Sequence, residues 1–194
     1  MTGMRIAGGA DRGRVSTMLA RAFADDPAMS WIFPDPVERA RRLPRLFALL
    51  FDEDAAGMRI VTGGAEAATL WRGPGRANTS TATMLRQAWP LWRALGANIQ
   101  RALKVSNAIA AHMPAGDFWY LHIAGCDPAA QGKGLGGAVV RAGLTRAAGR
   151  LPAYLETATE RNLGFYRSLG FEITDEWVVP GGGPRFWSML RPPD

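Results

Sequence analysis

The sequence predicts an α/β protein whose sheet contains strands of mixed direction. Segments of strand composition alternate with segments that repeat apolar residues at helical spacing, which is typical of the α/β class. The last two expected strands, residues 171–179 and 185–190, flank a turn of prolines and glycines and should pair antiparallel. With 194 residues and 47% hydrophobic content, the chain can build one sizeable core. We therefore expect a single domain over residues 1–194.

The N-terminal part predicts one strand and two helices. Residues 4–7 form a short apolar strand, and Asp11 is placed to cap a helix that runs to residue 24. Residues 28–35 lie between prolines and predict a loop. Residues 37–52 repeat apolar side chains at helical spacing beside several arginines, and Pro44 should kink this helix or mark its start.

The middle of the chain predicts a hairpin followed by a long helical stretch. Arg59–Thr62 and residues 67–71 are expected to be strands around a pair of glycines. Residues 79–112 repeat at helical spacing, with interruptions at Pro90 and Gly96. This helical insert could be part of the core, a dimer face or a lid over a substrate, and core is our default expectation.

A buried strand organises the second half of the chain. Residues 118–126 are aromatic, aliphatic or small, and Asp127-Pro128 ends the strand because proline cannot continue a ladder. Strict alternation would place four side chains on one face: Tyr120, His122, Ala124 and Cys126. The other face would carry Trp119, Leu121 and Ile123. Residues 153–158 predict the next strand, and a short helix after Asn162 should end at Gly170.

The segment between those strands predicts an anion-binding site. Residues 131–137 read Gln-Gly-Lys-Gly-Leu-Gly-Gly, and apolar residues then recur at helical spacing. The glycines therefore precede a helix, where free backbone N–H groups and the helix dipole favour an anion. Lys133 adds a positive charge.

Two familiar phosphate-binding motifs can be compared with this segment. The Walker A pattern fails, because Asp127 replaces its first glycine and Gly134 replaces its hydroxyl residue. The dinucleotide-binding pattern matches at Gly132, Gly134 and Gly137, and Glu156 lies about 20 residues further on. Its glycines should follow the strand almost at once, however, and too little chain follows for a doubly wound sheet.

The residues resemble a third family, the GCN5-related N-acetyltransferases (GNAT). Its pyrophosphate loop matches Gln131, Gly134 and Gly136, and residues 162–171 (Asn-Leu-Gly-Phe-Tyr-Arg-Ser-Leu-Gly-Phe) resemble a second family segment downstream. The resemblance covers most of the chain and is closest to the puromycin N-acetyltransferase-like group. It implies a mixed, mostly antiparallel sheet flanked by helices, and acetyl-CoA as the donor co-substrate.

The resemblance also assigns roles to individual positions. It implies that Tyr166 protonates the thiol leaving group, and that His122 or Glu156 removes the proton of the amine acceptor. Asp26, Trp31 and Phe33 would lie at the acceptor site, although the two aromatics fit the core equally well. The acetyl-CoA contacts implied are Ala124, Cys126, Gln131, Gly132, Lys133, Gly134, Leu135, Gly136, Gly137 and Asn162.

Acid–base chemistry explains why such groups are needed. An alkylamine with a pKa of about 10.4 is protonated at pH 7 and must lose that proton before it can attack, and a thiol with a pKa of about 8.5 leaves better when protonated. An imidazole with an ordinary pKa of about 6.5 suits proton removal, whereas Glu156 would need a raised pKa.

Composition limits the cofactors, partners and locations that we expect for the chain. One cysteine and two histidines argue against a disulfide framework or a metal cluster, so we expect no metal. The net charge of +6 comes mostly from scattered arginines, so we expect no nucleic-acid partner. Apolar runs are too short for a membrane span, and we expect a cytoplasmic monomer or homodimer.

Three function classes follow. The leading expectation is an N-acetyltransferase that acts on a small-molecule amine. The alternatives are a non-catalytic acetyl-CoA-binding module and a nucleotide-dependent oxidoreductase.

Overall fold

The computed structural model describes residues 3–77, 88–147 and 149–193, in which seven strands form one sheet. The strand order is β1-β2-β3-β4-β5-β7-β6, and β4 and β5 are the one parallel pair within the described sheet. The strands are β1 (Met4–Ile6), β2 (Arg59–Thr62), β3 (Ala67–Arg72), β4 (Trp119–Cys126), β5 (Ala153–Thr157), β6 (Glu172–Val178) and β7 (Arg185–Arg191). This mostly antiparallel order excludes the doubly wound sheet of the oxidoreductase alternative.

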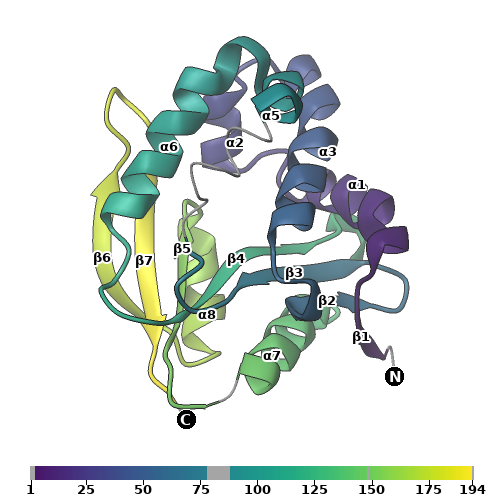
Figure 1. Cartoon of the computed structure of the whole chain (residues 1–194), viewed down its shortest axis with the longest axis vertical. Coiled ribbons are helices and arrows are strands. Elements are labelled where there is room, and N and C mark those ends of the chain that lie inside the picture. Colours follow the sequence, from purple (N-terminus) through teal and green to yellow (C-terminus); the bar gives the residue numbers. More distant parts are fainter. Residues whose placement is uncertain (1–2, 78–87, 148, 194) are drawn as a thin grey trace.

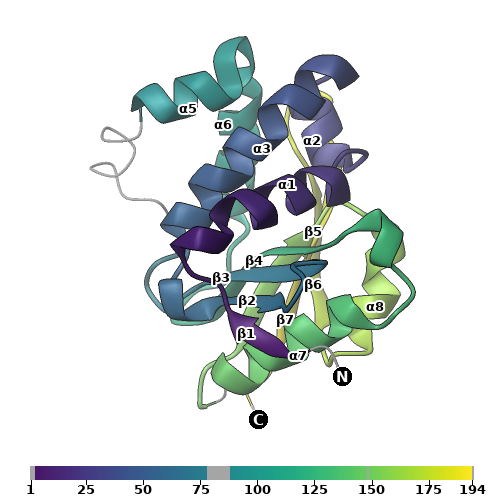
Figure 2. The ribbon, with the colours of Figure 1, turned by 90° about the vertical axis from the view of Figure 1, so that its right-hand side faces the viewer.

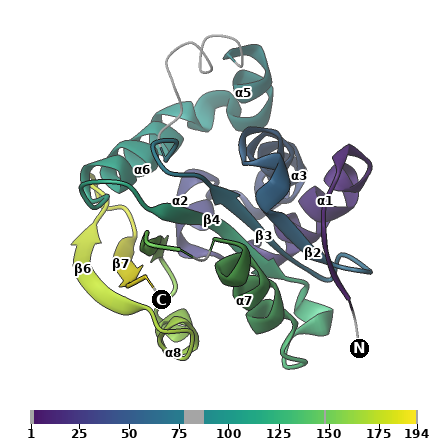
Figure 3. The ribbon, with the colours of Figure 1, turned by 60° about the horizontal axis from the view of Figure 1, so that its bottom comes forward.

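Helices cover both faces of the sheet, as Figures 1 and 2 show. Above it lie α1 (Arg12–Ala22), α2 (Pro27–Ile32), α3 (Pro36–Glu53), α5 (Ala88–Leu95) and α6 (Ile99–Ala111). Below it lie α7 (Leu135–Ala147) and α8 (Leu163–Arg167). Figure 3, in which the bottom of the molecule comes forward, shows α7 in front of the middle strands.

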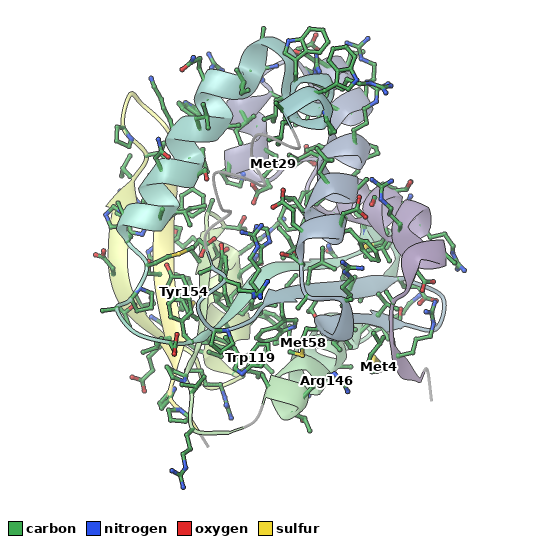
Figure 4. All side chains as sticks on the ribbon, viewed as in Figure 1. Met4, Met29, Met58, Trp119, Arg146 and Tyr154 are labelled. Carbon is green, nitrogen blue, oxygen red and sulfur yellow. The ribbon has the colours of Figure 1, made fainter. Side chains whose placement is uncertain are left out.

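Each helical layer has its own core. The upper core joins Leu19 of α1 and Phe47 of α3 to Ile123 of β4. The lower core joins Leu144 of α7 to Leu121 and Trp71. Figure 4 labels Met58 of this lower core and the neighbouring Arg146 of α7, whose Nε donates to the Gly57 carbonyl over 2.6 Å. The helix that carries the glycine segment is therefore anchored to the sheet along its length.

A β-bulge changes the faces that strict alternation predicts for β4. Leu70 pairs with Ile123, but the next residue, Trp71, pairs with Leu121, so His122 is the extra residue of the bulge. Ile123 and Tyr120 consequently lie on the upper face, and Leu121, Ala124 and Cys126 on the lower. The prediction that His122 shares a face with Ala124 and Cys126 is therefore wrong.

Two predictions for the N-terminal helices are also wrong. Residues 27–32 form the helix α2 rather than a loop, because Pro27 is tolerated in the first turn and Asp26 accepts hydrogen bonds from the N–H groups of Ala28 and Met29. Pro44 lies inside α3, which begins at Pro36, so Pro44 does not mark the start of this helix. Asp11 does not cap α1 with its side chain, which instead bonds Arg5 and the Gly8 N–H.

The helical insert is two helices in the part that the structure describes; residues 79–87 lie outside that part. Gly96 separates α5 from α6 with a φ of 55°, as expected of a glycine at a helix end. Leu95 and Val105 join the upper core, whereas Trp89 and Trp92 stack on each other and are 65% and 56% exposed. The default expectation of core is thus wrong for these two tryptophans. No described helix is both long and apolar enough to span a bilayer.

Candidate active site

The parallel strands β4 and β5 separate soon after they meet. They pair only at Trp119 with Ala153 and at Tyr120 with Tyr154, although both strands continue. His122 and Glu156 each lie two residues beyond the last pair, on opposite sides of the resulting opening. Backbone and side-chain groups of two strands are therefore available to a ligand there, which an intact ladder would not allow.

The glycine segment adopts the conformation that its composition predicts. After β4 the chain forms a short 3-10 turn at Pro128–Ala130, and Gly132 and Gly134 then have φ values of 79° and 74°. No heavy atom lies within 4 Å of where a Cβ would stand at either residue. Both glycines therefore border open space just before α7, where the free N–H groups of a helix N-terminus favour an anion such as a phosphate.

A cavity of about 680 Å³ extends from this segment to the last residues of β4, and neither His122 nor Glu156 is among its described lining residues. Nine of the ten residues predicted to contact acetyl-CoA line it: Ala124, Cys126, Gln131, Gly132, Gly134, Leu135, Gly136, Gly137 and Asn162. Lys133 is exposed and is not among the lining residues. The cavity is also lined by Arg21, Arg161 and Thr159, which the sequence did not single out.

Tyr166 lines the same cavity from α8. Its side chain is buried against the lower core. Burial, followed by the negative charges of Glu156 and Asp26, raises the pKa of Tyr166 far above its ordinary value. Its hydroxyl therefore keeps its proton across the neutral range and can act as a donor.

Glu156 lies beside the opening with one oxygen unpaired. The Tyr120 hydroxyl donates a hydrogen bond to Oε1, whereas the buried Oε2 has no partner among the described residues. Burial raises the pKa of Glu156 to about 7, against the opposing effects of the Tyr120 hydrogen bond and the Arg72 charge. A carboxyl group with this pKa can gain and lose a proton near neutrality.

His122 lies on the other side of the opening and contacts a buried carboxylate. Its Nδ1 is 3.0 Å from both oxygens of Asp54, the residue that follows α3. Arg72 Nε donates to Asp54 Oδ1 over 2.8 Å, and Arg72 also pairs with Glu53. Burial alone would raise the pKa of Asp54, but the charges and hydrogen bonds of His122 and Arg72 outweigh it and lower the pKa.

The residues predicted for the acceptor site are separated by the structure. Asp26 lines the cavity, although Oδ1 caps α2 and Oδ2 accepts from Thr159. Trp31 is absent from the described lining. Arg101 lies over its ring instead, with Cζ 5.6 Å from the ring centre of Trp31. Phe33 is fully buried in the upper core, which is the alternative that the sequence left open.

Three residues of the site were not predicted from the sequence. Asp54 follows an amphipathic helix, Arg72 ends a strand, and Tyr120 looks like one more apolar residue of β4. They meet only because α3, β3 and β4 are adjacent in the fold, at sequence separations of 18 for the Arg72–Asp54 pair and 68 for the His122–Asp54 pair. A charged residue close to the end of an apolar strand, such as Arg72, was the one hint available.

Comparisons with known proteins bear on the family and on the fold. Residues 88–171 match the model of the acetyltransferase (GNAT) family. The chain is similar to a crystal structure described as histone acetyltransferase HPA2 and related acetyltransferase from Corynebacterium glutamicum, with 27% identity and a TM-score of 0.73 over 100% of this chain and 98% of that chain.

More distant structures share the fold. Arylalkylamine N-acetyltransferase 2 from Aedes aegypti has a TM-score of 0.66 at 14% identity, and 99% of each chain is covered. Polyamine N-acetyltransferase from Drosophila melanogaster has a TM-score of 0.58 at 12% identity, covering 99% of this chain and 100% of that chain. The GNAT fold thus extends over the whole chain, and residues 88–171 match the model of the acetyltransferase (GNAT) family.

Proposed function

We propose that this protein transfers the acetyl group of acetyl-CoA to the amine of a small molecule. The observation that carries the proposal is the cavity that the glycine segment, the end of β4 and Tyr166 line together. The GNAT family match and the amine substrates in the names of the similar proteins support it. The puromycin N-acetyltransferase-like grouping stays a prediction.

Different residues around the cavity would contact different parts of acetyl-CoA. N–H groups at the start of α7 and glycines that leave room for phosphate oxygens would hold the pyrophosphate. Ala124 and Cys126, which lie on β4 beyond its last pair with β5, and Asn162 would contact the pantetheine arm. The thioester would then lie at the opening, beside Tyr166.

The reaction is a direct attack. The neutral amine nitrogen forms a bond to the thioester carbonyl carbon, the carbon–sulfur bond breaks, and the amine proton goes to a base while the sulfur takes a proton from Tyr166. Two groups at the opening can act as the base. Glu156 offers the unpaired Oε2 and a pKa of about 7, and His122 offers a ring nitrogen on the other side.

The test compares binding with turnover. Acetyl-CoA should raise the melting temperature of the protein, and release of free thiol should follow when arylalkylamines, polyamines or agmatine are added. Thermal protection without thiol release from any amine in the panel would favour the non-catalytic module. Absence of protection would contradict the acetyl-CoA site itself.

A further inference from the structure

We propose that Asp54 is a positioning residue that holds His122 with Nδ1 protonated and leaves Nε2 as the nitrogen that accepts the amine proton. The part of the proposal that concerns the amine proton rests on the proposed acetyl transfer. The proposal starts from the contact of His122 Nδ1 with both oxygens of Asp54, each at 3.0 Å. Among the described residues, no hydrogen-bond partner faces Nε2.

The surroundings of Asp54 decide which way the proton lies between the two side chains. The carboxylate is fully buried and accepts a hydrogen bond from Arg72 Nε over 2.8 Å, so it is held as an anion that can only accept. The His122 nitrogen that faces it must therefore carry the hydrogen. A neutral imidazole has one N–H, and Nε2 is then the free acceptor.

His122 is not among the described residues that line the cavity, but it lies on β4 two residues before Ala124, which does line it. It is the extra residue of the β4 bulge and stands beside the opening, opposite Glu156. Its side chain is 14% exposed, and its ring centre lies 5.2 Å from that of Tyr120. The charged group in contact with it is Asp54, which pairs with Arg72 of β3, and Arg72 also pairs with Glu53. Glu156 of β5 bonds the hydroxyl of the neighbouring Tyr120. Pairing by a buried carboxylate gives a histidine a fixed tautomer and orientation, as in serine hydrolases.

The first test reads the tautomer without any turnover. The chain has two histidines, so long-range proton–nitrogen NMR of the ligand-free, ¹⁵N-labelled protein can be assigned with His122→Gln. The neutral His122 ring should be the Nδ1–H tautomer. In Asp54→Asn, the Arg72 hydrogen bond keeps the remaining oxygen as acceptor and turns the new amide N–H₂ toward the ring, so the tautomer should invert to Nε2–H. A wild-type Nε2–H tautomer, or an unchanged tautomer in Asp54→Asn, would overturn the proposal.

The second test asks whether Asp54 acts through His122. Asp54→Asn should lower kcat by ~10²-fold or more with an unchanged KM for acetyl-CoA, because the inverted ring has no acceptor at Nε2. Adding Asp54→Asn to His122→Gln should then cost no further activity. Equal losses in both backgrounds would mean that Asp54 has only a structural role.

A nearby carboxylate provides the control. Asp52 lies at the same end of α3, but it pairs with Arg12 at the surface, so Asp52→Asn should keep the tautomer and kcat. Circular dichroism and the melting temperature would confirm folding of each variant. If no amine is acetylated by the wild-type protein, the proposed function fails while the tautomer measurement still decides the Asp54–His122 pairing.

Discussion

The Tyr120 hydroxyl donates to Glu156 Oε1 across two strands that pair no further than Tyr120 and Tyr154. The contact holds one carboxylate oxygen and leaves the other, Oε2, buried without a partner among the described residues. A buried carboxylate oxygen without a partner costs free energy of folding unless a ligand or a proton occupies it. We interpret this cost as the reason that the pKa of Glu156 is raised to about 7.

Replacing Glu156 should therefore change stability in a pH-dependent way. Burial raises the folded pKa of Glu156 from 4.5 to about 7, so the native state binds a proton more tightly than the unfolded state between these values. The contribution of Glu156 to the free energy of unfolding is fully present below the pKa of the unfolded state. It falls as the pH rises toward 7 and stays low above pH 7. Glu156→Gln should be more stable than wild type by roughly 3 kcal/mol at pH 8, and by much less at pH 4.5.

Urea unfolding at the two pH values measures this difference. The exposed Glu172→Gln on β6 is the control, and its free energy of unfolding should follow that of wild type. An equal gap for Glu156→Gln at both pH values would show that the ionisation of Glu156 is not perturbed by folding.

The identity of the base can be read from pH–rate profiles. His122→Gln and Glu156→Gln each remove one proton acceptor at the opening while keeping the size of the side chain. If His122 is the base, its variant should lose the acidic limb between pH 5.5 and 9 in single-turnover rates, and Glu156→Gln should keep it. The reverse result assigns the role to Glu156, and two parental profiles would mean that neither residue removes the proton.

The glycine segment should tolerate loss of charge better than added side chains. Gly134→Val and Gly136→Val place branched carbons in the space that phosphate oxygens would use, so acetyl-CoA affinity should fall severely. Lys133 is exposed and outside the cavity lining, so Lys133→Ala should cost about 1 kcal/mol of binding or less.

Calorimetry would check these affinities. Gly182→Val is the matched control, because Gly182 also has a positive φ, 76°, and open space, but lies in the turn between β6 and β7. Normal acetyl-CoA affinity in both segment variants would contradict the phosphate site.

The Tyr166 hydroxyl should matter for rate and not for binding. Tyr166→Phe keeps the buried ring and removes the proton donor, so kcat should fall by ~10²-fold or more with acetyl-CoA affinity preserved. Tyr154→Phe is a suitable comparison, since its hydroxyl is also buried but bonds Ser188 away from the cavity lining. Turnover at the parental level in Tyr166→Phe would remove the hydroxyl from the mechanism.

A close contact below the sheet should make α7 sensitive to a single methyl group. A Cβ on Gly143 would stand 2.5 Å from the indole nitrogen of Trp71, which is fully buried and cannot move aside. Gly143→Ala should destabilise the protein by about 1–3 kcal/mol, despite the better helix propensity of alanine. Gly164→Ala in α8 meets nothing within 4 Å and should be neutral or stabilising, and thermal unfolding of the pair tests both.

The sequence by itself determined the local structure of the glycine segment and the positions of the strands along the chain. Glycines at 132, 134 and 136 before an apolar helical stripe predicted an anion site at a helix N-terminus, because backbone conformation and free N–H groups depend on neighbours in the chain. The closing hairpin of β6 and β7 was predicted for the same reason, from its turn residues.

Tertiary structure alone decided the faces of β4 and the partners of its side chains. The bulge at His122 arises from pairing with β3, about 50 residues earlier in the chain, so alternation within β4 could not predict it. The contact between His122 and Asp54 spans a separation of 68 residues, and that between Tyr120 and Glu156 spans 36. Burial, charge and hydrogen bonds from distant segments shift the pKa values of Asp54, Tyr120 and Glu156, and such long-range interactions leave no periodic pattern in the sequence.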